Sequence, residues 1–400
     1  MISLNKSRII NLVRFYGPIS RTELSKKMDI SMAAITKYIS ELISENIITE
    51  SGTQKTHGGR RPILLSMNPD YGCVICIDFG QSFFRIAVLS IDNKILYKQI
   101  VPSDKLGLPE DGLLLINGMI ADVINKIPSS LKILAIGIAV SGITFDINGT
   151  RILMPNLKGW VDVDLETPIA KKFQIPVYID DSSRMVALCE SVVSAKGRIE
   201  NLIYIHLGTG IGAGIIINGK ILRGVNGTAG ELGHIIVEEG GRMCGCGSRG
   251  CLEQYVSVPS MVNQAKKAIL SGVRSNMLDY AEGDADRIDS YCLAKAVADK
   301  DKLAYNIVAE AGEYLGVGIS KVINLFNPEH IIIGGGGVKI SDMIMDDIKK
   351  VCHSRSIQEA VRHVDIKKSD KDENSALIGA SVAAQDRIFD MDKIQEYALL

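Results

Sequence analysis

The first seventy residues repeat hydrophobic positions with a helical period. Apolar residues recur three and four positions apart in three segments within residues 6–45, as expected when one face of each helix is buried. The second segment begins at Ser20, where Glu23 completes a capping box, and the third begins at Ser31. Two short β-like runs, "NIITESG" and "RRPILLSMN", then flank the basic stretch "TQKTHGGRR". Three helices followed by a basic hairpin predict a winged helix-turn-helix.

The third predicted helix has an apolar face and a polar face. The apolar face carries Ile35, Tyr38, Ile39, Leu42 and Ile43. In a winged helix-turn-helix this helix enters the major groove and the wing meets phosphates or the minor groove. We therefore predict that base edges are contacted by Ser31, Ala33, Thr36 and Lys37, and that the wing contacts DNA through Lys55, Arg60 and Arg61. The alternative is a helical dimerisation module with a solvated basic face, in which the wing sequence "GGRRP" has no obvious use.

From Tyr71 onward the pattern changes to alternating strands and helices. The segment "VICIDFGQSFFRIAVLSIDNKILYKQIV" predicts three strands, and "LIYIHLGTGIGAGIIINGKI" predicts a strand, a turn and a strand. Glycine-containing loops follow three apolar runs, and glycine lets backbone N–H groups approach a phosphate closely. The phosphate-loop candidates are Asp78, Gly80, Gly208, Thr209, Gly210, Gly212, Gly335 and Gly336. Each loop alone fits a plain turn equally well.

Length and charge limit the class of protein. With 400 residues, 46% of them hydrophobic, the chain is expected to form two or three folded units and not a disordered polymer. Residues 1–70 hold ten Lys or Arg against six Asp or Glu, a net +4, although the whole chain has a net charge of −1. This split suits a polyanion partner at the N-terminal end. No apolar run reaches the roughly 20 residues needed to cross a bilayer, so we expect a cytoplasmic protein without a membrane partner.

The eight cysteines fall into two groups. Five lie in apolar or helical contexts and are expected to pack as small hydrophobic residues: Cys73, Cys76, Cys189, Cys292 and Cys352. The other three stand with a histidine in "HIIVEEGGRMCGCGSRGC", residues 234–251. Clustered cysteines in a reducing compartment suggest a metal site, and a redox or sensor role is the alternative.

Taken together, the order of the motifs resembles the ROK family, named for repressors, open reading frames and sugar kinases. The motifs are the DxG loop, "MPNLKGW", "DD" before a helix, "GTGIGAG", "ELGH", "CGCGSRGCLE" and "GGGG". The resemblance spans about residues 63–384, and the added winged helix-turn-helix is similar to the repressor branch, with its xylose-type and N-acetylglucosamine-type regulators. It implies an α/β fold with two actin-like, hexokinase-like (ribonuclease H-like) lobes and a cleft for sugar and nucleotide. We expect a DNA-binding domain at 1–70, lobe I at 71–182 and lobe II at 183–400, and we leave open that the C-terminal helix returns to lobe I.

The resemblance also implies site residues. A closed structural Zn²⁺ site would be formed by His234, Cys244, Cys246 and Cys251. Sugar contacts would come from Ser141, Gly142, Asn156, Asp181, Glu231, His234 and Glu253. In the family's kinases the carboxylate matching Asp181 is the general base that accepts the proton of the attacking hydroxyl. We expect Asp180 or Ser182 to cap the following helix and Asp181 to be reserved for the sugar.

One motif departs from the family's kinases. They have DxGGT at the first phosphate loop, where this chain has "DFGQSFF". A side chain at Gln81 would intrude on the phosphate and could impose a φ angle that favours glycine. We therefore expect a repressor that binds double-stranded operator DNA and a sugar or sugar phosphate, as a homodimer or homotetramer. The alternative is an ATP-dependent sugar kinase, and ATP with Mg²⁺ would be a cofactor only in that case.

Overall fold

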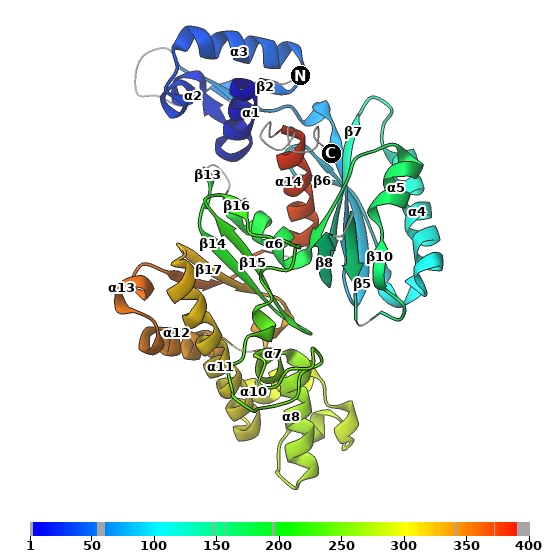
Figure 1. Ribbon diagram of the computed structural model, residues 1–400, viewed down its shortest axis with the longest axis vertical. Helices are drawn as coiled ribbons and strands as arrows, with labels where there is room; N and C mark the ends of the chain where they lie inside the picture. Colours follow the sequence, from blue (N-terminus) through cyan, green and yellow to red (C-terminus); the bar gives the residue numbers. More distant parts are fainter. Residues whose placement is uncertain are drawn as a thin grey trace. The chain divides into compact units, whose positions relative to one another are not determined.

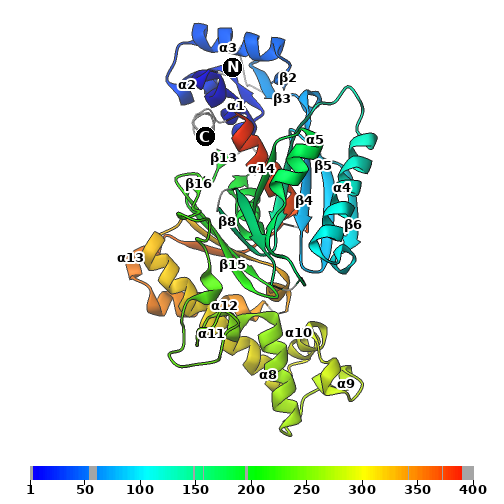
Figure 2. The same ribbon diagram turned by 45° about the vertical axis from the view of Figure 1, so that its right-hand side comes forward.

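The structure, a computed structural model, is shown in Figures 1 and 2. It describes residues 3–53, 61–146, 149–155, 157–193, 197–340, 342–371 and 373–389. The chain divides into two compact units. Unit 1 comprises Met1–Ile199, Gly224–Thr228 and Lys371–Leu400, and unit 2 comprises Glu200–Arg223 and Ala229–Asp370. The domain boundaries expected at residues 70 and 182 stay predictions.

The N-terminal part of unit 1 has the predicted helices and hairpin. Its helices are α1 (Leu4–Tyr16), α2 (Arg21–Met28) and α3 (Met32–Ser44), and its strands are β1 (Ile19–Ser20), β2 (Ile48–Thr53) and β3 (Ile63–Met67). The strands form an antiparallel sheet in the order β1-β3-β2. The Ser20–Glu23 capping box is present, and α2 ends at Asp29, which adopts the left-handed conformation with φ of 54°. This turn lets α3 begin three residues later, at Met32, at a new angle.

The rest of unit 1 is built on a five-stranded sheet in the order β11-β7-β4-β5-β6. Its strands are β4 (Cys73–Phe79), β5 (Phe83–Ser90), β6 (Ile95–Pro102), β7 (Ile133–Val140) and β11 (Val177–Asp181). Strands β11, β7 and β4 are parallel, whereas β5 and β6 are antiparallel to their neighbours. All seven residues of β4 are buried, because helices cover both faces of the sheet. In Figures 1 and 2, α4 (Pro109–Lys126) lies on one face and α14 (Ser375–Phe389), drawn in red, on the other.

Smaller elements complete unit 1. A three-stranded sheet has the order β10-β9-β8, and a two-stranded hairpin, β12-β13, follows helix α6. Their bounds are β8 (Ile143–Asp146), β9 (Thr150–Leu153), β10 (Val161–Asp164), α5 (Glu166–Phe173), α6 (Ser182–Ser191), β12 (Val192–Val193) and β13 (Gly197–Arg198), with 3₁₀ turns η1 (Pro69–Tyr71) and η2 (Ser103–Leu106). Helix α6 packs tightly on α14: a Cβ added to Gly379 would lie 1.7 Å from the carbonyl oxygen of Met185.

Unit 2 repeats the sheet plan with the order β16-β15-β14-β17-β18. Its strands are β14 (Leu202–Leu207), β15 (Ile211–Ile217), β16 (Lys220–Ile221), β17 (His330–Gly334) and β18 (Asp365–Lys368). Its helices are α7 (Glu253–Val256), α8 (Val258–Leu270), α9 (Met277–Tyr280), α10 (Ser290–Ala298), α11 (Lys302–Phe326), α12 (Met343–Arg355) and α13 (Gln358–Val361), with 3₁₀ turns η3 (Leu232–His234), η4 (Ala285–Arg287) and η5 (Gly336–Lys339). One core joins the sheet to α7, α8, α10, α11 and α12.

Two expectations about composition can be compared with the fold. The five cysteines outside the histidine-containing stretch are all buried, as predicted for packing residues. None of the helices in the described part of the chain has both the length and the apolar character needed to span a bilayer.

Candidate functional site

The predicted DNA-reading face of α3 is exposed. Ser31 caps the helix, as expected from the sequence, and Ala33, Thr36 and Lys37 are exposed on the side opposite the buried core. The Thr36 hydroxyl donates a hydrogen bond to the carbonyl of Met32 at 2.7 Å. The side chain therefore leaves its methyl group and its acceptor lone pairs exposed, and its contact with a base edge stays a prediction.

The reading helix is fixed to α1 by a shared lysine. The Lys6 Nζ lies 2.9 Å from a Glu41 carboxylate oxygen and 2.7 Å from one of Glu45. Both acids belong to the C-terminal half of α3 or its cap, so the orientation of α3 follows that of α1.

The wing is only partly described. Arg61 is exposed just before β3, whereas Lys55 and Arg60 lie outside the described residues. We predict that Arg61→Ala lowers affinity for random-sequence duplex DNA and reduces the slope of log K against log salt by about 0.9, the value for one lost phosphate contact. Fluorescence anisotropy titrations at several salt concentrations measure this slope, with Lys171→Ala, on exposed helix α5, as the control. A slope equal to that of the unmodified protein would exclude Arg61 from the interface.

The histidine and three cysteines of residues 234–251 form one cluster in unit 2. One ligand atom from each of His234, Cys244, Cys246 and Cys251 lies within 4.8 Å of all the others. The Cys246 and Cys251 sulfurs are 3.7 Å apart, and the Cys244 sulfur is 3.7 Å from His234 Nδ1. Two sulfurs bound to one tetrahedral zinc ion are about 3.8 Å apart, so the cluster fits such an ion. A hydrogen bond from the Ser248 backbone is the main cause that lowers the pKa of the Cys246 thiol to about 6, which favours the thiolate that binds metals.

The loop that carries the cluster is also held by packing. Tyr255 of α7 and Tyr314 of α11 stack with ring centroids 4.3 Å apart. The Tyr255 hydroxyl accepts a hydrogen bond from the Arg242 N–H at 2.9 Å, and the Tyr314 hydroxyl donates one to Glu238 at 3.1 Å. Gly250 has φ of +80°, and a Cβ there would lie 1.8 Å from the Glu238 carbonyl oxygen, so only glycine fits.

In unit 1, the predicted sugar residues lie at the ends of β7 and β11. Ser141 and Gly142 follow β7, and the Ser141 hydroxyl is 3.3 Å from that of Ser182. A Cβ on Gly142 would lie 2.4 Å from the carbonyl oxygen of Leu153, so a close backbone approach requires glycine here. Asn156 lies outside the described residues.

The expected division of roles between the two aspartates is wrong in one respect. Asp181 itself caps α6, its Oδ1 accepting hydrogen bonds from the backbone N–H groups of Ser183 (2.8 Å) and Arg184 (3.2 Å). Asp180 instead forms an ion pair with Arg184 at 2.7 Å, with both side chains at most 5% exposed. Adjacent strand residues point to opposite faces, so Asp180 reaches Arg184, whereas Asp181 is the last strand residue and lies next to the first N–H groups of the helix. The general-base role of Asp181 stays a prediction.

In unit 2, three predicted sugar residues lie beside the metal cluster. Glu253 starts α7 two residues after Cys251, and its carboxylate accepts a hydrogen bond from the Ile211 N–H at 3.0 Å. His234 turns Nδ1 toward Cys244 and has Nε2 4.0 Å from Glu231. One imidazole can thus bind a metal and orient a carboxylate, as metal-bound histidines commonly do.

The first phosphate-loop candidate contains an ion pair that the sequence did not suggest. Asp78, 6% exposed at the end of β4, accepts a hydrogen bond from Arg85 of β5 at 2.8 Å. Desolvation by burial raises the pKa of Asp78 to about 6, although Arg85 opposes this shift. Neither Gly80 nor Gln81 has a positive φ, so the expectation that Gln81 imposes a glycine-like φ is wrong. The unexpected feature of this loop is therefore the Arg85 guanidinium beside Asp78, and not a strained backbone.

In the other two glycine loops, an added side chain would clash with neighbouring protein atoms. A Cβ on Gly208 would lie 2.5 Å from His206 Nε2, and one on Gly210 would lie 2.7 Å from the Glu253 carboxylate. Gly335 has φ of +95°, and its Cβ would lie 2.4 Å from the Leu207 carbonyl oxygen. The remaining candidates are placed nearby, Thr209 exposed in the same turn, Gly212 on β15 and Gly336 at the start of η5. Glycine is therefore required in both loops for packing inside unit 2, and their role in binding phosphate stays a prediction.

Two arginines of these sites were missed. Arg85 interrupts the apolar run "FFRIAVL", and Arg184 stands four residues after Asp180, the helical spacing for a pair. A single cation in a buried strand, or at that spacing from an acid, is the signal that could have identified them.

Comparisons with known proteins identify the family of the chain. Residues 74–387 match the ROK family. The chain is 32% identical over 397 residues to the xylose repressor of Caldicellulosiruptor bescii, covering 99% of this chain and 98% of that protein. Its structure is similar to the crystal structure of a ROK family transcriptional regulator, a homolog of the E. coli MLC protein (TM-score 0.82, 28% identity, 99% of each chain). It also resembles a ROK family glucokinase from Streptomyces griseus solved with glucose and AMPPNP (TM-score 0.66, 28% identity), which matches 78% of this chain and 99% of its own.

Proposed function

Because the chain belongs to the ROK family, we propose that it is a sugar-responsive transcriptional repressor that binds operator DNA through α3 and the wing. The observation that carries this proposal is the exposed face of α3, in a domain that precedes the family match at residue 74. The similarity to repressors covers 99% of the chain, whereas the glucokinase covers 78%. A DNA-reading domain joined to a sugar-binding fold is what a sugar-controlled repressor requires.

A sugar kinase is the second candidate. The intact glycine loop at 208–212 and the likeness to the glucokinase support it. The Asp78–Arg85 pair argues against it, because the carboxylate of the first phosphate loop already has a cation beside it. Gln81 adds a side chain where the family's kinases have glycine. We therefore assign sugar recognition to the fold and no phosphoryl transfer.

Zinc is the metal that the cluster of residues 234–251 favours. Three thiolates and one imidazole are a common structural zinc set, and four protein donors leave no position for a reacting water. Bound zinc would supply a fixed loop geometry and no chemistry. The residues that it would hold in place, Glu231 and Glu253, are two of the carboxylates assigned to the sugar.

The proposed partners follow from this function. Double-stranded operator DNA is the macromolecular partner, and a homodimer or homotetramer would match two half-sites. D-Xylose is the first effector to test, because the relative from Caldicellulosiruptor is a xylose repressor. The protein would act in the cytoplasm, where operator DNA is found.

The nucleotide loop gives a separate prediction. Gln81→Gly should raise affinity for Mg-ATP, measured by calorimetry, and Gln81→Ala should do the same because φ at this position is not positive. Adding Arg85→Gln should raise it further by freeing Asp78. If only Gln81→Gly raises the affinity for Mg-ATP, the φ angle at position 81 limits nucleotide binding after all. If the unmodified protein and all variants bind Mg-ATP equally, neither Gln81 nor Arg85 limits nucleotide binding.

The experiment for the proposed function combines binding and turnover. The purified protein is incubated with Mg-ATP and xylose, glucose or N-acetylglucosamine, and ADP release and melting temperature are recorded. We expect one sugar to raise the melting temperature without ADP release, and Asp181→Asn to lose that shift. Asparagine caps helices as well as aspartate does, so this variant should keep α6 intact. Sugar-dependent ADP release that Asp181→Asn abolishes would instead establish a kinase.

A further inference from the structure

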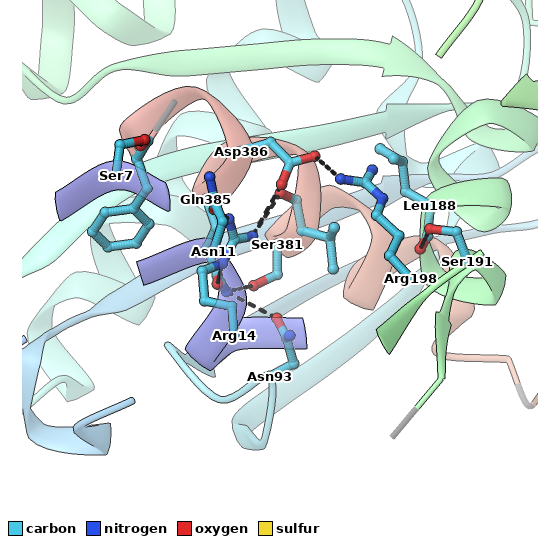
Figure 3. Close-up of polar contacts among 12 residues, drawn as sticks. Ser7, Asn11, Arg14, Asn93, Leu188, Ser191, Arg198, Ser381, Gln385 and Asp386 are labelled. Atoms are coloured by element: carbon cyan, nitrogen blue, oxygen red, sulfur yellow. Dashed lines mark hydrogen bonds and ion pairs between the residues drawn. The ribbon is translucent and has the colours of Figure 1, made fainter. Parts of the chain in front are cut away.

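Three segments of unit 1 that are far apart in sequence meet at one carboxylate, Asp386 of α14 (Figure 3). Arg14 of α1 lies 3.1 Å from Asp386 Oδ1, and Arg198 of β13 lies 3.0 Å from Oδ2. The side chains of Arg14, Arg198 and Asp386 are 4%, 14% and 13% exposed. One largely buried carboxylate thus joins the DNA-binding domain, the hairpin after α6 and the C-terminal helix.

A further hydrogen bond ties Arg14 to α14, and another holds its side chain on α1. Its Nε donates to Gln385 Oε1 of α14 at 3.1 Å, and its Nη1 donates to Asn11 of α1 at 2.8 Å. The Gln385 amide donates in turn to Asn93 and to Ser381, at 2.9 and 3.0 Å. The planar guanidinium therefore has a fixed place in α14 that a lysine could not reproduce.

The two arginines also share an aromatic neighbour. The guanidinium carbons of Arg14 and Arg198 lie 4.9 and 5.0 Å from the ring centroid of Phe15. Two cations this close repel each other unless Asp386 compensates, and removing one member of a buried ionic group leaves an uncompensated charge. Gly197 brings the hairpin against α1, since a Cβ there would lie 2.4 Å from the Tyr16 ring.

The junction is held by these polar contacts next to open space. A cavity of about 680 Å³ lies between α1, the β2-β3 sheet, residues 91–94 and α14, and Arg14, Asn93 and Gln385 line it. This cavity is open to solvent and is not a void in a close-packed interior. The DNA-binding domain is joined to the rest of unit 1 by an apolar core that includes Ile91 and Phe389 and, at the edge of the cavity, by the charged contacts of Arg14 and Asp386.

Helix α14 and the β12-β13 hairpin, which contact α1, both also contact α6, the helix capped by Asp181. Helix α14 crosses α6 at Gly379, and the β12-β13 hairpin continues directly from the end of α6. The Ile199 N–H after the hairpin returns a hydrogen bond to the Ser191 carbonyl at 2.8 Å. A displacement of α6 thus reaches Asp386 through α14 and Arg198 through the hairpin.

We propose that Asp386, with Arg14 and Arg198, is the positioning group that transmits sugar occupancy at the N-terminus of α6 to α1 and the DNA-reading helix. This proposal rests on the proposed function. The carboxylate holds α1 in one orientation relative to α14, and sugar binding at Asp181 changes the relation of α6 to both of its partners. Coupling requires a physical element that both sites bias, and this junction contacts both.

The test compares operator affinity with and without D-xylose, or whichever sugar raises the melting temperature. Fluorescence anisotropy gives the operator Kd in each state, and calorimetry gives the sugar Kd. The unmodified protein should show a ratio of operator Kd values in the range of about 5- to 150-fold that allosteric proteins display. In Asp386→Asn we expect a ratio within about twofold of unity and a nearly unchanged sugar Kd, because the substitution removes the coupling and not the sugar contacts.

Matched variants separate coupling from stability. Asp92→Asn makes the same chemical change beside the same cavity, but Asp92 pairs with Lys94 of its own turn, so it should keep the full ratio. Asp386→Glu retains the charge and should recover part of the ratio of operator Kd values. Arg198→Lys is a second variant for the case that Asp386→Asn does not fold, and it should reduce this ratio. If well-folded Asp386→Asn keeps the same ratio of operator Kd values as the unmodified protein, the proposal is overturned. If sugar does not change the operator Kd of the unmodified protein, the proposed function itself fails.

Discussion

Replacing Lys37 by glutamate is expected to weaken operator binding by about 100-fold or more. Lys37 is exposed in the second turn of α3, on the face opposite the buried Ile35 and Ile39. If α3 lies in the major groove, the substitution removes a cation and places an anion next to phosphates, and like charges at an interface cost several kcal/mol. Fluorescence anisotropy with operator DNA measures the change.

The fold should tolerate this substitution, because the cap at Ser31 and the buried face of α3 are untouched. Lys171→Glu, an equal charge reversal on an exposed helix, should change operator affinity by less than about threefold, since no phosphate is expected beside it. Equal effects of the two reversals would mean that overall charge, and not α3, determines DNA affinity.

Replacing Cys251 by serine is expected to abolish metal binding. Cys251 is fully buried, and its sulfur lies 3.7 Å from that of Cys246 in the four-residue cluster. A serine hydroxyl is a much poorer zinc ligand than a thiolate, and loss of a ligand opens a site that requires four. Elemental analysis should show about one zinc ion per chain in the unmodified protein and almost none in the variant.

Sugar binding should fall with the metal. Glu253 follows Cys251 by two residues, and His234 connects the cluster to Glu231, so the loop that presents both carboxylates loses its fixed shape. We expect a sugar Kd at least about tenfold higher, in line with the loss seen when supports of a metal site are removed. Cys292→Ser, also in a buried position of unit 2, is the control that should retain zinc. Protein purified without chelators that contains no zinc would refute the assignment.

The sequence carried enough local information to predict the DNA-binding domain. Ser20, Glu23 and Ser31 act through hydrogen bonds that span three residues, so their capping roles can be seen in a short segment. The apolar spacing of α3 predicted its buried and exposed faces for the same reason, although Tyr38 and Ile43 are only half-buried.

The cluster of His234 and the three cysteines was also accessible, since all four residues lie within eighteen positions and one loop brings them together. The glycine loops could be located from the sequence, but the side chains that lie against them could not. The Asp78–Arg85 pair depends on the antiparallel register of β4 and β5, which places these two residues opposite each other.

Contacts between distant segments could not be predicted. Arg14 and Asp386 are 372 positions apart, and only the return of α14 to unit 1 brings them together. The cap at Asp181 was misassigned because adjacent aspartates look equivalent in the sequence, and only the structure shows that Asp181 caps α6 while Asp180 pairs with Arg184.

The most direct test of the account is operator affinity measured as a function of sugar. Genomic fragments that the purified protein selects in vitro supply the DNA, and anisotropy titrations with and without the sugar that raises the melting temperature supply the two Kd values. If the protein is a sugar-controlled repressor, this sugar changes the operator Kd by at least about fivefold while no ADP is released from Mg-ATP. An unchanged Kd at saturating sugar, together with sugar-dependent ADP release, would contradict it and identify a kinase.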